Sequence, residues 1–377
     1  MADPRPTYLE FFAGAGMARA GLGPGWRPLF ANDLDPMKAA AYALNGDAAH
    51  LRVGDVWDLT AADLPPGAAD LAWASSPCQD LSLAGRRGGL AAERSGAFWG
   101  FHRLMAELVA GGRAPRLVVL ENVTGLLSSR EGSDFAALCE ALHALGYRFG
   151  ALELDAAAWT PQSRPRLFVV AHRGAMHTAL LSPAPSGPFH TRRVAEAVAA
   201  LPAPLRSAHL WWRLPAPPAR NLALADVLEH DADAAWHPPE ATARLLSLLA
   251  PLHRARLEAG GSGRRVGAVY RRTRREDGRR VQRAEVRFDG LAGCLRTPAG
   301  GSSRQFLAVV EAGRTRTRAL APREAARLMG LPDDWALPAS ATAALKVLGD
   351  GVAAPAVRWL AAHLLEPLLE GAARRAA

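Results

Sequence analysis

The sequence predicts an α/β fold in which helices cover a sheet of parallel strands. In the first half of the chain, short apolar runs alternate with segments of helical periodicity, a pattern typical of parallel strands joined by helices. Of the 377 residues, 49% are hydrophobic and 21% are charged, which is the composition of a folded globular protein and not of a disordered one. The length allows one large domain and a smaller one.

The strands and helices of the first half can be placed one after another. Each expected strand is a short apolar run, and each expected helix has apolar residues three or four positions apart. We expect strands at 8–12, 28–31, 51–56, 70–73, 117–120, 151–155 and 166–170, and helices from a turn at 13–16 through 22, at 98–109 and at 134–145. Since strands and helices alternate, we expect the strands to share one sheet.

The second half of the chain has a different character. Proline and alanine dominate residues 183–218, which predicts a boundary with an irregular crossover. After it we expect a helix at 239–258 and strands at 266–270 and 284–288, where the residues alternate. From Pro322 onward the chain is expected to be helical again.

The charge of the chain predicts a polyanionic partner. The formal net charge is +9 and the isoelectric point is about 10.4, a balance typical of proteins that bind nucleic acid. Arginine-rich composition can also reflect the base content of a genome. The segment 264–287, however, holds ten arginines against three acidic residues, and this uneven placement indicates a local basic patch. The alternative for its Arg271, Arg272, Arg274 and Arg275 is a solvated turn.

The cysteine content predicts a reducing compartment. The three cysteines, Cys78, Cys139 and Cys294, are too few for a disulfide framework. No basic-then-apolar signal opens the sequence, and no apolar run is long enough to span a membrane. We therefore expect a cytoplasmic protein without a membrane partner.

A glycine turn follows the first expected strand. Residues 12–16 read Phe-Ala-Gly-Ala-Gly, and glycine at such a place lets the backbone approach a ligand closely. Asp33 ends the second strand and Asp55 the third, where an acid can bind ribose hydroxyls or accept a hydrogen bond from an adenine amino group. Many tight turns share the glycine pattern, so the two acids are what favour a nucleotide-like cofactor.

Cys78 follows the fourth expected strand. Pro77 cannot continue a central strand, so the chain leaves the sheet there and places the thiol on a loop. The glycine-rich segment 81–96 that comes next predicts a movable lid. The alternative is that Cys78 is a small buried hydrophobe, as many cysteines are.

Two further motifs carry charged groups. Glu121 ends a buried strand beside the one that leads to Cys78; alternatively it is a helix N-cap or a structural acid. Arg164 and Arg166 share one face if the chain is extended; alternatively both are solvated surface charges. A thiolate that adds to C6 of cytosine makes C5 nucleophilic, provided that an acid engages N3 and an arginine holds O2. Cys78, Glu121 and Arg166 suit that chemistry.

Nine short motifs run in order along nearly the whole chain, outside about 190–290. They are Phe12-Ala13-Gly14-Ala15-Gly16, Asp33, Gly54-Asp55, Pro77-Cys78-Gln79, Arg94-Ser95-Gly96, Glu121-Asn122-Val123, Gln162-x-Arg164-x-Arg166, Leu320-x-Pro322-Arg323-Glu324 with Arg327, and Gly349-x-x-Val352-x-x-Pro355. In this order they resemble the cytosine-C5 DNA methyltransferase family of bacterial type. The sequence departs from the family at Asp350, where asparagine is usual.

The resemblance implies a Rossmann-like sheet of the S-adenosylmethionine-dependent methyltransferases and a smaller, irregular target-recognition domain. It implies S-adenosyl-L-methionine as the cofactor and no metal. The residues implied to line the cofactor pocket are Phe12, Ala13, Gly14, Ala15, Gly16, Asp33, Asp55, Val56, Pro77, Phe98 and Val352. The implied catalytic residues are Cys78 as the nucleophile, Glu121 as the partner of N3, and Arg164 and Arg166 as clamps on the base.

The resemblance also implies duplex DNA as the substrate, with the target cytosine flipped out and held covalently through Cys78 and C6. The residues expected to contact DNA are Gln79, Ser82, Arg86, Arg87, Arg271, Arg272 and Arg304. The expected division is a catalytic domain at 1–190, a recognition domain at 191–337, and a segment at 338–377 that returns to the catalytic domain. A monomer is expected, and a restriction endonuclease that acts on the same site is a candidate partner. The alternatives are an RNA cytosine-C5 methyltransferase and a non-catalytic DNA-binding protein on the same fold.

Overall fold

The computed structural model describes residues 3–77, 96–176, 178–259, 263–276, 278–297 and 304–370. The chain forms two compact units. Unit 1 comprises Met1–Leu154, Pro165–Pro217 and Ala356–Ala377, and unit 2 comprises Asp155–Arg164 and Pro218–Pro355. These bounds differ from the expected boundaries at 190 and 338, because the helices after residue 190 pack on the first sheet and the helix at 341–350 belongs to unit 2.

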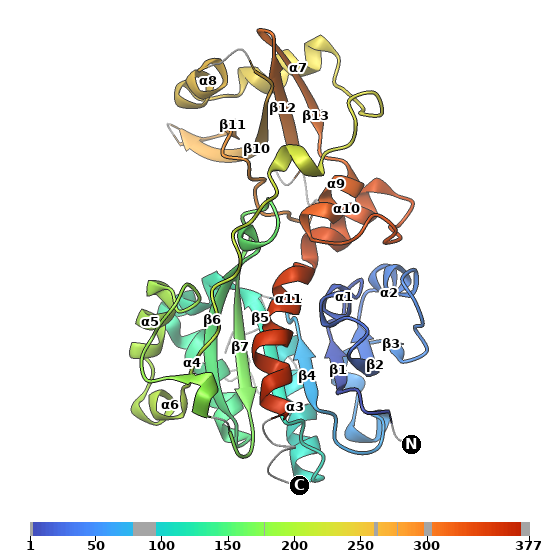
Figure 1. Cartoon of the computed structure of the whole chain (residues 1–377), viewed down its shortest axis with the longest axis vertical. Coiled ribbons are helices and arrows are strands. Elements are labelled where there is room, and N and C mark those ends of the chain that lie inside the picture. The colour runs from blue at the N-terminus through green and yellow to red at the C-terminus, as the bar shows by residue number, and fades with distance from the viewer. Residues whose placement is uncertain are drawn as a thin grey trace. The chain divides into compact units, whose positions relative to one another are not determined.

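Unit 1 contains a seven-stranded sheet in the order β3-β2-β1-β4-β5-β7-β6 (Figure 1). Its strands are β1 (Thr7–Phe11), β2 (Arg27–Asp33), β3 (Leu51–Val53), β4 (Leu71–Ala74), β5 (Leu117–Val123), β6 (Arg148–Asp155) and β7 (Pro165–His172). The parallel pairing expected from the sequence is confirmed from β3 through β5. It is wrong for β7, which pairs antiparallel with β5, because apolar runs encode burial and not strand direction.

Helices cover both faces of this sheet. The helices of unit 1 are α1 (Met17–Leu22), α2 (Pro36–Ala43), α3 (Ala97–Ala110), α4 (Ser133–Ala144), α5 (Arg192–Ala199), α6 (Ala203–Ala208) and α11 (Ala354–Leu360), which continues as a π-helical turn at Ala361–Leu365. The side chains of Leu9, Val118 and Val169 share one core with α3 and α4. Helix α11 crosses the other face (Figure 1). Both α3 and α4 agree with their expected bounds to within one residue at each end.

The third expected strand, at 51–56, is shorter than the sequence indicated. Strand β3 ends at Val53, because Gly54 has a φ of +156° and the Asp55 carboxylate accepts a hydrogen bond from Trp57 N at 3.0 Å. This cap starts a 3₁₀ turn at Val56–Asp58, and side-chain capping of this kind competes with strand pairing.

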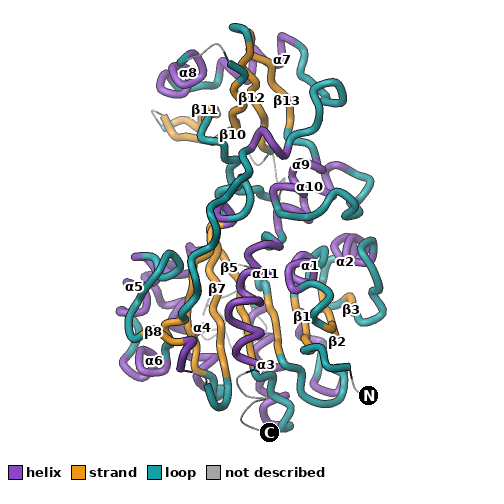
Figure 2. Tube along the Cα trace, viewed as in Figure 1, coloured by secondary structure: helices purple, strands orange, loops and turns teal. Residues whose placement is uncertain are grey.

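Unit 2 contains a four-stranded antiparallel sheet in the order β11-β10-β12-β13, with helices beside it (Figure 2). Its elements are α7 (Pro239–Ser247), α8 (Pro251–Glu258), β10 (Arg265–Glu276), β11 (Arg279–Arg287), β12 (Gln305–Glu311), β13 (Arg314–Ala319), α9 (Pro322–Leu328) and α10 (Ala341–Asp350). The expected helix at 239–258 is divided in two, because Pro251 has no N–H and starts a new helix. The arginines of the basic patch lie on the β10–β11 hairpin. Within the described residues, no helix is both long and apolar enough to cross a membrane.

Candidate active site and cofactor site

The turn after β1 has a backbone that few residues adopt. Phe12, Gly14 and Gly16 have φ values of 57°, 58° and 79°, which lie in the left-handed region that favours glycine. A Cβ at Gly16 would lie 3.0 Å from the Tyr42 ring, whereas a Cβ at Gly14 would meet no atom within 4 Å. The turn therefore packs closely against Tyr42 at Gly16 and leaves open space beside Gly14.

Asp33 holds this turn in place from the end of β2. Its two carboxylate oxygens accept hydrogen bonds from Gly14 N and Asp35 N, both at 2.8 Å. Ala13, within the turn, donates from its N–H to Asn32 O at 3.0 Å. Each carboxylate oxygen keeps a second lone pair, so Asp33 can both position the turn and accept from a ligand.

One residue at this edge of the sheet was missed from the sequence. Leu34, directly after Asp33, is 66% exposed, which is unusual for a leucine at the end of a buried strand. The signal was present in the sequence as a large apolar residue between two acids, Asp33 and Asp35. Val56 and Phe98, both expected at the cofactor, are almost fully buried and belong to the core that includes α3.

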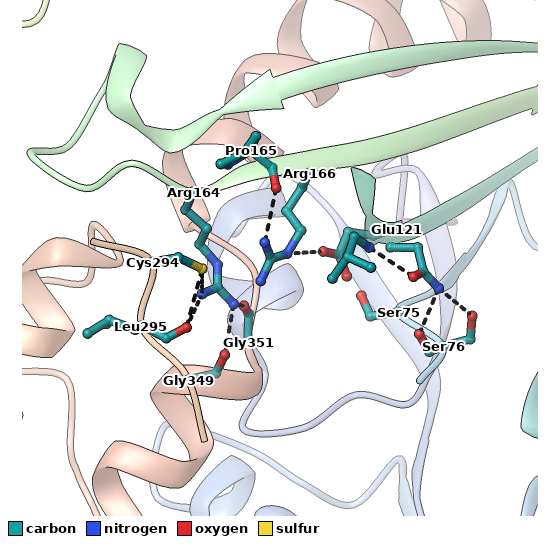
Figure 3. A network of polar contacts seen from close by, with 12 residues as sticks. Ser75, Ser76, Glu121, Arg164, Pro165, Arg166, Cys294, Leu295, Gly349 and Gly351 are labelled. Carbon is teal, nitrogen blue, oxygen red and sulfur yellow. Dashed lines mark hydrogen bonds and ion pairs between the residues drawn. The ribbon is translucent and has the colours of Figure 1, made fainter. Parts of the chain in front are cut away.

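Glu121 and Arg166 meet at the junction of β5 and β7 (Figure 3). Arg166 Nε lies 3.2 Å from Glu121 Oε1, and both side chains are largely buried. The antiparallel register places Arg166 opposite Val123, so the two charged groups come from adjacent strands. The carboxyl group of Glu121 and the guanidinium group of Arg166, both expected to bind the target cytosine, therefore contact each other.

Asn122 fixes the backbone that leads toward Cys78. Its Nδ2 donates to Ser76 O at 3.1 Å, and its Oδ1 accepts from Val123 N at 2.8 Å. Ser76 is buried and Pro77 is exposed, so the chain comes to the surface immediately after this contact. Cys78, with Gln79, Ser82, Arg86 and Arg87, lies outside the described residues.

Replacing Asn122 with alanine is expected to lower kcat/KM by about 10²-fold, because a shift of about 1 Å in a reacting group costs this much. The Ser76 carbonyl would lose its buried donor, and the start of the Cys78 loop would move. Steady-state kinetics on a folded variant, verified by circular dichroism, measure the effect. Ser76→Ala is the control, since it removes only the longer 3.4 Å contact with Asn122 and should change the rate much less.

Arg164 has a different environment from Arg166. It belongs to unit 2 and is 1% exposed. Its guanidinium donates to the carbonyl oxygens of Leu295 at 2.8 Å, Gly349 at 2.9 Å and Gly351 at 2.5 Å (Figure 3). The expectation that Arg164 clamps a base is not favoured by this arrangement, because its donors join the backbone at Leu295 to the backbone at Gly349 and Gly351.

The remaining expected site residues lie in unit 2. Val352 is buried and lies in the short segment between the end of α10 at Asp350 and the start of α11 at Ala354. Asp350, the departure from the family pattern, accepts a hydrogen bond from Thr297. Arg304 is exposed and donates to Thr342 Oγ1 at 3.1 Å. Arg271 and Arg272 lie on β10.

Glu10 is a buried acid on β1, close to the glycine turn. Burial, with a smaller contribution from Asp33, raises its pKa to about 8, although Arg19 and Tyr42 oppose the shift. Because the folded form binds this proton more tightly than the unfolded form, whose pKa is near 4.5, the contribution of Glu10 to stability is complete below pH 4.5. It is lost as the pH rises to about 8.

Glu10→Gln, which cannot ionise, should therefore unfold at nearly the same temperature as the native protein at pH 5. At pH 8 it should be more stable by about 4 kcal/mol, since each unit of the difference between a pKa of 4.5 and one of about 8 corresponds to about 1.4 kcal/mol. Thermal unfolding between pH 5 and pH 9 measures the difference. A constant offset at every pH would contradict the raised pKa.

The glycine turn and the strand-end acids, on a sheet of this order, are typical of an α/β enzyme that binds a nucleotide-containing cofactor. The family model of the C-5 cytosine-specific DNA methylases matches residues 7–366. The chain therefore belongs to this family of DNA (cytosine-5-)-methyltransferases.

Individual relatives agree with this assignment. The Type II methyltransferase M.HpaII of Haemophilus parainfluenzae is 25% identical over 382 residues, which cover 96% of this chain and 90% of that protein. M.BsuFI of Bacillus subtilis is 31% identical over 167 residues, so the match spans 44% of this chain and only 38% of the relative. Among solved structures, the Dnmt2 methyltransferase of S. pombe superposes with a TM-score of 0.62 at 17% identity, over 97% of this chain and 99% of that one. This last likeness concerns the fold alone.

Proposed function

We propose that this enzyme transfers a methyl group from S-adenosyl-L-methionine to C5 of a cytosine flipped out of duplex DNA. The proposal rests above all on the ion pair between Glu121 and Arg166. Glu121 directly precedes Asn122, whose side chain holds the backbone of Ser76, two residues before Cys78. A base must leave the stack to reach these groups, because stacking covers its C6 face in the duplex. DNA methyltransferases are among the known cases of such base flipping.

The residues around the glycine turn fit the proposed cofactor. The space beside Gly14 admits a ligand close to the backbone, and the exposed Leu34 offers an apolar surface to the adenine ring. Asp33 would accept from the ribose hydroxyls and Asp55 from the adenine amino group. The cofactor supplies an electrophilic methyl group on its sulfonium. Phe12, Ala15, Pro77, Phe98 and Val352 remain proposed members of the same pocket.

The protein groups divide the chemistry among them. The thiolate of Cys78 bonds to C6, and the electron pair of the C5–C6 double bond becomes available at C5. Glu121 holds a proton at N3, and Arg166 donates to O2, so that the negative charge that develops on the ring is stabilised. After C5 has bonded to the methyl group, loss of the C5 proton restores the double bond and expels the thiolate, which leaves 5-methylcytosine.

Methyl transfer to duplex DNA tests the proposal directly. The protein is incubated with genomic duplex DNA and methyl-labelled S-adenosylmethionine, and the product is read by bisulfite sequencing. We expect 5-methylcytosine at one recurrent sequence. Structured RNA is the comparison substrate: labelling of RNA alone would favour an RNA methyltransferase, and DNA binding without labelling would favour a non-catalytic protein.

We further propose that the protein acts as a monomer and that a restriction endonuclease acts on the same site. The second proposal is supported by the name Type II methyltransferase that M.HpaII and other relatives carry. DNA from cells that express this chain should resist an endonuclease whose recognition sequence contains the methylated site. Sedimentation of the purified protein measures its oligomeric state.

A further inference from the structure

A cavity of about 230 Å³ opens on the sheet of unit 2, and arginines surround it. The residues that line it are Ser163, Tyr270, Arg271, Arg272, Arg287, Gly293, Cys294, Arg296 and Gln305. No aspartate or glutamate is among them. Four arginines thus line one space in whose wall the described residues include no acid, and a space of this kind attracts an anion.

The charge around this cavity is only partly compensated within the protein. Arg272 shares the carboxylate of Glu285 with Arg274, and Arg287 pairs with Asp289. Neither Arg271 nor Arg296 has a carboxylate partner within the described residues. Among these five arginines, two carboxylates therefore pair with three guanidinium groups, and two guanidinium groups are left without a carboxylate.

Aromatic rings orient two of these arginines. The Arg271 guanidinium lies 5.0 Å from the centroid of the Phe306 ring, and that of Arg272 lies 5.3 Å from the Tyr270 ring. A guanidinium that stacks by its face keeps its N–H groups free at the edge, in the fork geometry that matches a phosphate. In addition, the buried Nε of Arg271 has no hydrogen-bond partner within the described residues.

Gln305 is not available to read a base from this cavity. Its Nε2 donates to Gly293 O at 2.7 Å, and its Oε1 accepts from Gly293 N at 2.9 Å. Both ends of the amide are therefore used to hold the segment around Gly293. The groups left to meet a ligand are chiefly guanidinium donors, which suit phosphate oxygens.

We propose that this cavity, which we call the phosphate seat, binds a backbone phosphate of duplex DNA and so sets the position of unit 2 on the duplex without reading sequence. The inference rests on the proposed function for the identity of the polyanion. Contacts to phosphate fix register and orientation, whereas contacts to base edges carry specificity. Arg271 and Arg296 are the main contributors, because no carboxylate in the described residues neutralises them.

Arg271→Gln and Arg296→Gln test the phosphate seat separately and together. Each should weaken binding to duplex DNA about 5-fold at 0.15 M salt and lower the slope of log K against log salt by about 0.9, as expected for one lost phosphate contact. The loss should be equal for a duplex that contains the methylated sequence and for a shuffled duplex of the same composition. Arg271→Lys, which keeps the charge but not the fork, should recover part of the affinity.

Arg244→Gln is the matched control, since Arg244 is exposed on α7 and does not line the cavity. If both test variants bind DNA as this control does, the phosphate seat is refuted. A loss confined to the methylated sequence would also overturn it, because that result indicates base readout. If the native protein methylates no DNA while the two variants still lose affinity for duplex DNA, the proposed function fails and the phosphate seat stands.

Discussion

Replacing Cys78 with serine is expected to abolish methyl transfer, by on the order of 10⁴-fold or more, while DNA and cofactor binding survive. Serine keeps the size of the side chain but is a much weaker nucleophile at neutral pH than a thiolate. Transfer of labelled methyl groups, with binding of DNA and of S-adenosylmethionine measured separately, distinguishes lost chemistry from lost binding.

Cys139→Ala is the control for this experiment, because Cys139 is buried in α4 within the core and takes no part in the proposed chemistry. It should retain methyl transfer at temperatures below its unfolding transition. Duplex DNA with 5-fluorocytosine at the target adds a second readout, since fluorine cannot leave C5 as a proton does. The native enzyme should form a covalent adduct with that DNA and Cys78→Ser should not. Full activity of Cys78→Ser would refute the nucleophile.

Replacing Arg164 with methionine is expected to destabilise unit 2 by at least about 3 kcal/mol. The substitution keeps an unbranched apolar stem but removes the donors to the buried carbonyl groups of Leu295, Gly349 and Gly351. Each buried polar group left without a partner costs about 1–3 kcal/mol. Differential scanning calorimetry should show a lower transition temperature, and Arg164→Lys should restore little, because one ammonium group cannot reach three carbonyls with the fork of a guanidinium.

Arg166→Met is the comparison that separates the two arginines of the motif. Its effect should fall mainly on methyl transfer and less on the transition temperature, since the Arg166 side chain engages Glu121 and the carbonyl of Pro165 and does not hold the three carbonyl groups that Arg164 holds. If Arg164→Met instead keeps native stability and loses only the rate, Arg164 contacts the substrate and the structural interpretation is wrong.

Much of the sheet could be predicted from the sequence. Strands such as Leu71–Ala74 and Leu117–Val123 are buried on both faces and therefore appear as continuous apolar runs. The bounds of α3 and α4 follow from their helical periodicity. The glycine turn was recognisable because only glycine adopts the left-handed backbone readily at positions 14 and 16.

The partners of the polar side chains could not be predicted in this way. Gln162 was only one position of a motif, yet it is fully buried and joins Leu328 O to Leu295 N. Gln305 is likewise buried, and each end of its amide makes a hydrogen bond with the backbone of Gly293. Spacing along the chain says which residues share a face, but it does not say which distant carbonyl or amide will lie opposite them.

By itself, the sequence determined the α/β class, the order of the strands in the first half, the basic character of the segment 264–287 and the family, but it did not indicate helix α2 at Pro36–Ala43. Only the tertiary structure decided that β7 runs antiparallel to β5, that Arg166 meets Glu121 while Arg164 holds backbone carbonyls, and that the arginines of β10 surround a cavity. The physical reason is that apolar periodicity records how deeply each residue is buried. The pairing of a buried charge depends on what the fold brings to it from elsewhere in the chain.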